Sequence, residues 1–129
     1  MQDEAHTPLI YAASCAKCAD DGQRDPALSL KLLEHMANMW AKDIPPNDPR
    51  VSPLFANQEG LAPTMVFSGD REILDSDALR LKAKNPAIDH RRYAEMMHVW
   101  PVGPTREAKK ALDEASQFIL RQLSVKNPA

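Results

Sequence analysis

The feature of this sequence that most constrains its fold is a short continuous run of apolar and β-branched residues at positions 63–68, PTMVFS. A strand with one face in water alternates apolar and polar residues, and this run does not alternate. It therefore predicts a strand that is covered on both faces, as in a parallel sheet. Gly69 follows the run and predicts that the chain turns into a loop there.

Three helices are expected around this strand, each preceded by a residue type that caps helix N-termini. Their approximate spans are 30–42 after Ser29, 76–85 with Asp75 or Ser76 as the cap, and 106–123 after Thr105. A second, more polar strand is expected near residues 88–95, where it would form a sheet edge. This alternation predicts an α/β fold in which parallel strands are flanked by helices.

Apolar side chains at helical spacing identify the faces that we expect to be buried. On the first predicted helix they are Leu30, Leu33, Met36, Ala37, Met39 and Trp40, and on the last they are Ala108, Ala111, Leu112, Ala115, Ile119 and Leu123. Residues 50–62 are expected to form an ordered loop anchored by Val51, Leu54, Phe55 and Leu61. Surface positions are expected for His6, His35, His90, Arg91 and Arg92.

Composition limits the class of protein. With 129 residues the chain has the usual size of one domain, and its net charge of −2 argues against a nucleic-acid partner. No apolar run is long enough to span a bilayer, and the first residues are acidic where a signal peptide is basic, so we expect no membrane span and a cytoplasmic location. Cys15 and Cys18 form a C-x-x-C pair without further ligands, so we expect two incidental thiols, no metal and no cofactor.

Two ionisable residues follow the two predicted strands. Glu72 comes shortly after the first, and His98 comes shortly after the second. Ligands of parallel sheets bind beyond the carboxyl ends of the strands, so an acid and a base are expected at the same edge. Two or three parallel strands with three helices cannot cover such a sheet completely. The chain therefore looks like part of a larger sheet.

Several segments together resemble a known family. They are DPALS at 25–29, DPRVSPL at 48–54, LAPTMVFSGDREIL at 61–74 and MHVWP at 97–101. In this order and at this spacing they resemble the C-terminal portion of the hormone-sensitive-lipase-like esterases, the α/β-hydrolase fold-3 group. Residues 25–129 are thus expected to form the C-terminal part of an α/β-hydrolase domain, a partial α/β-hydrolase fold, whereas residues 1–24 match only weakly.

The resemblance implies a serine carboxylic-ester hydrolase with a catalytic triad of Ser, Asp or Glu, and His. It implies that His98 is the general base and that Glu72 is the acid, with Asp70 and Asp75 as alternatives. Trp40 and Trp100 are implied as residues that line the substrate site. A small-molecule ester is the implied substrate.

The sequence departs from that family at the nucleophile. It contains no G-x-S-x-G turn and no oxyanion motif of the H-G-G-G type. We therefore expect a fragment of an esterase that is inactive alone. Two alternatives stay open. In one, a partner chain or an upstream coding region supplies the missing half; in the other, the chain is a non-catalytic interaction module that forms an oligomer.

Overall fold

The computed structural model describes residues 25–45 and 47–126, and its elements follow one another as helices alternating with strands. They are α2 (Leu30–Trp40), the 3-10 turn η2 (Pro53–Phe55), β1 (Met65–Gly69), α3 (Asp75–Lys84), β2 (Asp89–Tyr93), the 3-10 turn η3 (Trp100–Val102) and α4 (Arg106–Lys126). The predicted α/β class is confirmed. None of the described helices is both long enough and apolar enough to cross a lipid bilayer.

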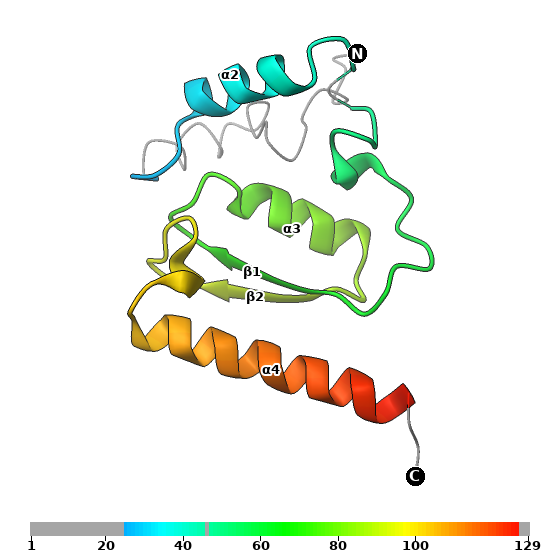
Figure 1. The fold of residues 1–129 in the computed structure, drawn as a ribbon, viewed down its shortest axis with the longest axis vertical. Coiled ribbons are helices and arrows are strands. Elements are labelled where there is room, and N and C mark those ends of the chain that lie inside the picture. Colours follow the sequence, from blue (N-terminus) through cyan, green and yellow to red (C-terminus); the bar gives the residue numbers. More distant parts are fainter. Residues whose placement is uncertain (1–24, 46, 127–129) are drawn as a thin grey trace.

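The two strands pair in parallel, with Met65 opposite Asp89 and Gly69 opposite Tyr93. Helix α3 connects them and lies on one side of the pair, while α4 lies on the other side (Figure 1). Because the strands are parallel, both leave the sheet at the same edge. The loops that follow β1 and β2 are thereby brought together.

Two of the three predicted helix caps are observed. Ser29 Oγ accepts a hydrogen bond from Leu32 N at 3.2 Å, and Thr105 Oγ1 accepts one from Ala108 N at 3.0 Å. The cap predicted for the middle helix is wrong, because Leu74 occupies the N-cap position without a side-chain hydrogen bond. Asp75 lies inside the first turn, and its carboxylate is held by groups outside the helix.

The buried core is small. Leu33 of α2 packs with Ile73, and the half-buried residues Leu28, Leu30 and Leu74 surround them. The expectation that β1 is covered on both faces is wrong for its first three residues, which are half-buried. In the part of the chain that the structure describes, β1 has one neighbouring strand and helices that cover it only in part.

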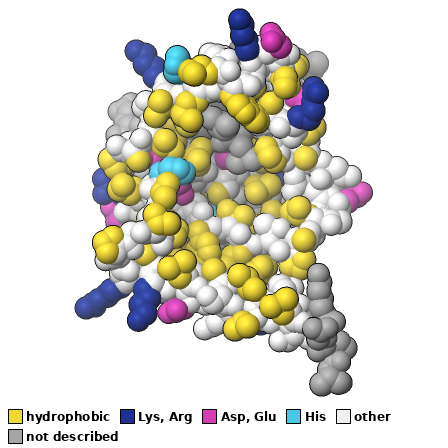
Figure 2. Space-filling model, in the orientation of Figure 1, with side chains coloured by type: hydrophobic (Ala, Val, Ile, Leu, Met, Phe, Trp, Pro, Cys, Tyr) yellow, Lys and Arg dark blue, Asp and Glu magenta, His cyan; other side chains and the backbone are white. Residues whose placement is uncertain are grey.

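Much of the expected core is exposed. On α2, Met36, Met39 and Trp40 are exposed, and on α4 so are Leu112, Ile119 and Leu123. In the loop at 50–62, Val51 and Leu54 are buried and Phe55 is half-buried, but Leu61 is exposed, and residues 53–55 form a 3-10 turn. Figure 2 shows hydrophobic side chains spread over one face of the molecule. These side chains form apolar stripes as predicted, but no described element covers them.

Candidate active site

The parallel pairing of the strands continues into the loops that follow them. Asp70 N donates to the carbonyl oxygen of Tyr93 at 3.0 Å, and Arg71 N donates to that of Met96 at 3.1 Å. Gly69 allows this approach, because a Cβ at its position would collide with the Met96 carbonyl. The two loops therefore lie against each other at the carboxyl edge of the sheet.

Glu72 and His98 meet where these loops touch. Glu72 Oε2 lies 2.9 Å from His98 Nδ1, and Glu72 Oε1 accepts a hydrogen bond from Gly69 N at 2.7 Å. The glutamate is buried, with 6% of its surface exposed. An ionised carboxylate only accepts hydrogen bonds, so Nδ1 is the donor in this contact, and in the neutral imidazole Nε2 then carries the lone pair. Nε2 is thus the ring atom that can accept a proton from a substrate or nucleophile.

The backbone around His98 is strained on both sides. Glu95 has φ of 60° and Val99 has φ of 62°, both in the left-handed region. This region costs roughly 1–2 kcal/mol for residues with a Cβ, and a β-branched valine is rarely found there. Such strain persists only where the surrounding contacts impose it.

An aromatic cluster anchors the chain just after His98. Trp100 is buried, and its ring centroid lies 4.4 Å from that of Tyr93 and 6.2 Å from that of Phe67 in an edge-to-face arrangement. The pairing of Trp100 with these strand residues fixes the far end of the His98 loop. Trp40, by contrast, is exposed near the end of α2.

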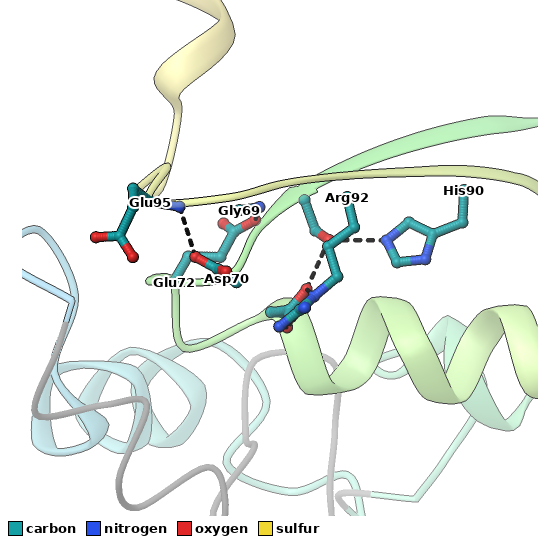
Figure 3. Close-up of polar contacts among 8 residues, drawn as sticks. Gly69, Asp70, Glu72, His90, Arg92 and Glu95 are labelled. Carbon is teal, nitrogen blue, oxygen red and sulfur yellow. Dashed lines mark hydrogen bonds and ion pairs between the residues drawn. The ribbon is translucent and has the colours of Figure 1, made fainter. Parts of the chain in front are cut away.

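The two other candidate acids have different partners. Asp70 Oδ1 accepts a hydrogen bond from Glu95 N at 2.7 Å, and Figure 3 shows the Asp70 side chain directed at that nitrogen. Asp75 accepts bonds from Arg92 Nη2 at 2.7 Å and from Ser68 Oγ at 2.7 Å. Of the three acidic residues proposed from the sequence, Glu72 is the one brought into hydrogen-bond distance of His98.

Comparison with known proteins places this chain in a family. A family model of the alpha/beta hydrolase fold matches residues 5–102. The chain belongs to the α/β-hydrolase fold family. An esterase of Acinetobacter venetianus is 34% identical to this α/β-hydrolase chain over 107 residues, which cover 74% of this chain and 34% of that protein. An acetyl-hydrolase of Streptomyces hygroscopicus is 32% identical, covering 90% of this chain and 44% of that protein.

A solved structure agrees with this assignment. The esterase from the bacterial hormone-sensitive lipase family aligns with a TM-score of 0.80 and 26% identity, covering 88% of this α/β-hydrolase chain and 40% of the other. The predicted resemblance to hormone-sensitive-lipase-like esterases is confirmed. The chain spans less than half the length of these relatives. Residues 1–24, expected to match weakly, lie outside the described residues, as do His6, Cys15 and Cys18.

A second polar network in this α/β-hydrolase chain was missed from the sequence. His90 Nε2 lies 2.7 Å from Ser68 Oγ, which in turn donates to Asp75, and Arg92 holds the other side of Asp75 (Figure 3). The surface position expected for His90 is therefore wrong, because this residue is half-buried and hydrogen-bonded. Arg92 is exposed as expected, although it pairs with the buried Asp75. Ser68 is only 1% exposed, so this Ser, His and Asp set has no access for a substrate. Burial lowers the pKa of His90, against the opposing effect of Asp75.

The burial of one further acidic residue was not predicted from the sequence. Asp77, in the first turn of α3, has no exposed surface and forms an ion pair with Arg80 at 3.1 Å. Its Oδ2 atom has no hydrogen-bond partner. Burial raises the pKa of Asp77 from 3.8 to about 6, and Arg80 opposes this change. The described residues contain no cluster of three His, Cys, Asp or Glu side chains that could hold a metal ion.

Proposed function

We propose that this chain supplies the acid and the base of a serine carboxylic-ester hydrolase, with His98 as general base and Glu72 as the residue that orients it. The observation that carries this proposal is the contact of 2.9 Å between His98 Nδ1 and a carboxylate that Gly69 N also holds. With both carboxylate oxygens engaged, the imidazole is held with Nδ1 towards the acid and Nε2 directed away from it. This is the arrangement that a serine hydrolase requires of its last two triad members.

The chemistry follows from the positions of the protons. His98 Nε2 takes the proton of a serine hydroxyl as the serine oxygen attacks the ester carbonyl carbon, and the resulting imidazolium is stabilised by Glu72. The imidazolium then protonates the departing alcohol, which leaves an acyl-enzyme. Water hydrolyses that intermediate by the same proton transfers in the second half of the reaction. Glu72 stays ionised throughout.

The serine and the oxyanion donors are not found in this sequence. It contains no G-x-S-x-G turn, and Ser68 is buried in its own hydrogen-bond network. We propose that polypeptide outside the given sequence supplies both, and that the substrate is a small carboxylic ester. The chain by itself should therefore not hydrolyse p-nitrophenyl acetate or butyrate above the rate of free imidazole, because nucleophile and oxyanion donors supply most of the rate.

Nitrogen-15 NMR of the histidine rings in the full chain tests the base and its orienting acid. At neutral pH, wild-type His98 should carry its proton on Nδ1, with a downfield ring-proton signal. Glu72→Gln should remove that signal, because Gly69 N–H takes the single amide oxygen and the NH2 group then faces Nδ1. Asp89→Asn, which removes a half-buried carboxylate paired with Arg91, should not. A His98 ring protonated on Nε2 in the wild type would contradict the proposal.

Activity is then tested in a complete enzyme. The full chain would replace the matching portion of the Acinetobacter venetianus esterase, and hydrolysis of p-nitrophenyl butyrate would be measured. His98→Ala should abolish turnover, and Glu72→Gln should lower kcat by about 10⁴. Circular dichroism of each variant shows whether the chimera has kept its fold. Full activity of the Glu72 variant in a folded chimera would move the acid elsewhere.

The exposed apolar residues favour a second candidate, a non-catalytic interaction module. Side chains such as Trp40, Leu120 and Val102 are more than half exposed. A homo-oligomer that covers them would need neither a serine nor a substrate. Sedimentation velocity separates the candidates, because a well-folded monomer at micromolar concentration excludes the module built on self-association.

A further inference from the structure

Asp70 stands between the two loops of the candidate site but does not contact the reacting groups. Its carboxylate accepts the Glu95 N–H at 2.7 Å (Figure 3), while its own N–H donates to Tyr93 O at 3.0 Å. One residue thus holds the start of the His98 loop with its side chain and the end of β2 with its backbone. The next residue, Arg71, adds a backbone bond to Met96 O at 3.1 Å.

The N–H that Asp70 binds belongs to a strained residue. Glu95 has a left-handed φ of 60°, and Val99, on the other side of His98, has φ of 62°. The Glu95 side chain contributes little to holding this turn, because its ion pair with Arg71 is 3.6 Å long and exposed. The 2.7 Å hydrogen bond from Glu95 N–H is the stronger restraint, because it is shorter and holds the backbone itself. The direction in which the chain enters the His98 loop is therefore set at the Asp70 contact.

We propose that Asp70 is a positioning residue for His98, acting through the Glu95 backbone rather than on the imidazole. This inference rests on the proposed role of His98 as base. The two neighbouring acids then have different roles in positioning His98. Glu72 orients the imidazole ring, and Asp70 holds the backbone from which that ring projects. The property that matters at position 70 is the hydrogen-bond acceptor, not the negative charge.

An amide retains the acceptor and removes the charge, so Asp70→Asn and Asp70→Ala form a matched pair. In the full chain labelled with nitrogen-15, Asp70→Ala should speed hydrogen exchange at Glu95 N–H about tenfold and broaden the His98 Nδ1–H signal. Asp70→Asn should keep both within about twofold of wild type, because its carbonyl oxygen still accepts the bond. Asp89→Ala, which removes a carboxylate from β2, should change neither.

Two outcomes would overturn the inference. The first is that Asp70→Ala leaves Glu95 exchange and the His98 signal as they are in the wild type. The second is that Asp70→Asn loses both, which would make the charge the important property. If Asp70→Ala fails to fold, as judged by spectral dispersion, the folded Asp70→Asn variant alone decides, and loss of Glu95 protection there counts against the proposal.

Failure of the proposed function has a different signature. Glu72→Gln should abolish the His98 Nδ1–H signal but leave Glu95 N–H protected, because the two contacts are made by different acids. If wild-type His98 shows no protonated Nδ1 at all, the catalytic role of the pair is wrong. Glu95 exchange in the two Asp70 variants still reports whether Asp70 holds the loop.

Discussion

Four carboxylates lie within eight residues of one another, and each has a different environment. Asp70 accepts a backbone N–H, Glu72 faces His98, Asp75 is held by Arg92, and Asp77 keeps one oxygen without a partner. The sequence placed an acid at this strand end but left three of them open as the partner of the histidine. Asp70 bonds to Glu95, Glu72 to His98 and Asp75 to Arg92, which lie 25, 26 and 17 positions away, and no local pattern encodes such contacts.

Asp77 gives a prediction at the residue scale. Its pKa is raised from 3.8 to about 6, so between these values the folded chain binds more protons than the unfolded chain. Stability contributed by this residue therefore falls as the pH rises from about 4 to 6, and the loss is complete above that range. Asp77→Asn should then stabilise the chain at pH 7.5 by up to about 2–3 kcal/mol.

Urea denaturation at two pH values measures this effect. The gain from Asp77→Asn should largely disappear at pH 3.5, where the aspartate is mostly protonated in both states. Asp113→Asn, on α4, serves as the matched control and should show no such pH-dependent gain. A destabilised Asp77→Asn variant at pH 7.5 would mean that the ion pair with Arg80 outweighs the burial of the charge.

At the scale of elements, the sequence predicted the strands and helices more accurately than it predicted the contacts between them. Ser29 and Thr105 cap helices as predicted, because a cap is a contact between residues three positions apart. The start of α3 was misplaced, because Asp75 bonds to Ser68 on β1 and Arg92 on β2 instead of capping its own helix. A network that joins three elements is visible only after the elements have been assembled.

The contact between the two loops predicts how the addition of one methyl group at Gly69 affects stability. In Gly69→Ala the new Cβ would collide with the Met96 carbonyl, so the loops must separate. We expect a loss of about 2–3 kcal/mol in the free energy of unfolding, and loss of the His98 Nδ1–H signal in the part that remains folded.

Gly60→Ala is the matched control for this substitution. Gly60 has φ of +72° and no atom within 4 Å of the added Cβ, so its cost of about 1 kcal/mol comes from the backbone alone. Chemical denaturation of both variants separates the two effects. Equal losses at the two positions would show that the loops can part without consequence.

At the scale of the whole molecule, the apolar stripes were predicted correctly and their burial was not. The same helical spacing marks Ala108 and Ala111, which are buried, and Ile119 and Leu123, which are exposed. A stripe specifies that a face needs a cover but not which element provides it. The chain spans less than half the length of its relatives. Which element covers these faces therefore depends on the assembly of the whole molecule.

The exposed half of α4 leads to a prediction about assembly. The double variant Ile119→Lys with Leu123→Lys should change the free energy of unfolding of the chain alone by no more than about 0.5 kcal/mol, because neither side chain is buried. In the esterase chimera the same variant should lose stability or activity, because charges would enter a covered interface. Loss of stability in the chain alone, accompanied by a change in sedimentation, would instead identify a self-associating surface.

The acid and the base of the candidate site are only 26 positions apart and belong to one strand, helix and strand unit. Contacts this close in sequence form quickly, because little chain has to be ordered to close them. We therefore expect the pair to assemble during synthesis while α4 is still inside the ribosome. A chain stalled on the ribosome with its last residue near the end of α4, so that α4 still lies in the exit tunnel, should already show the contact between Glu72 and His98.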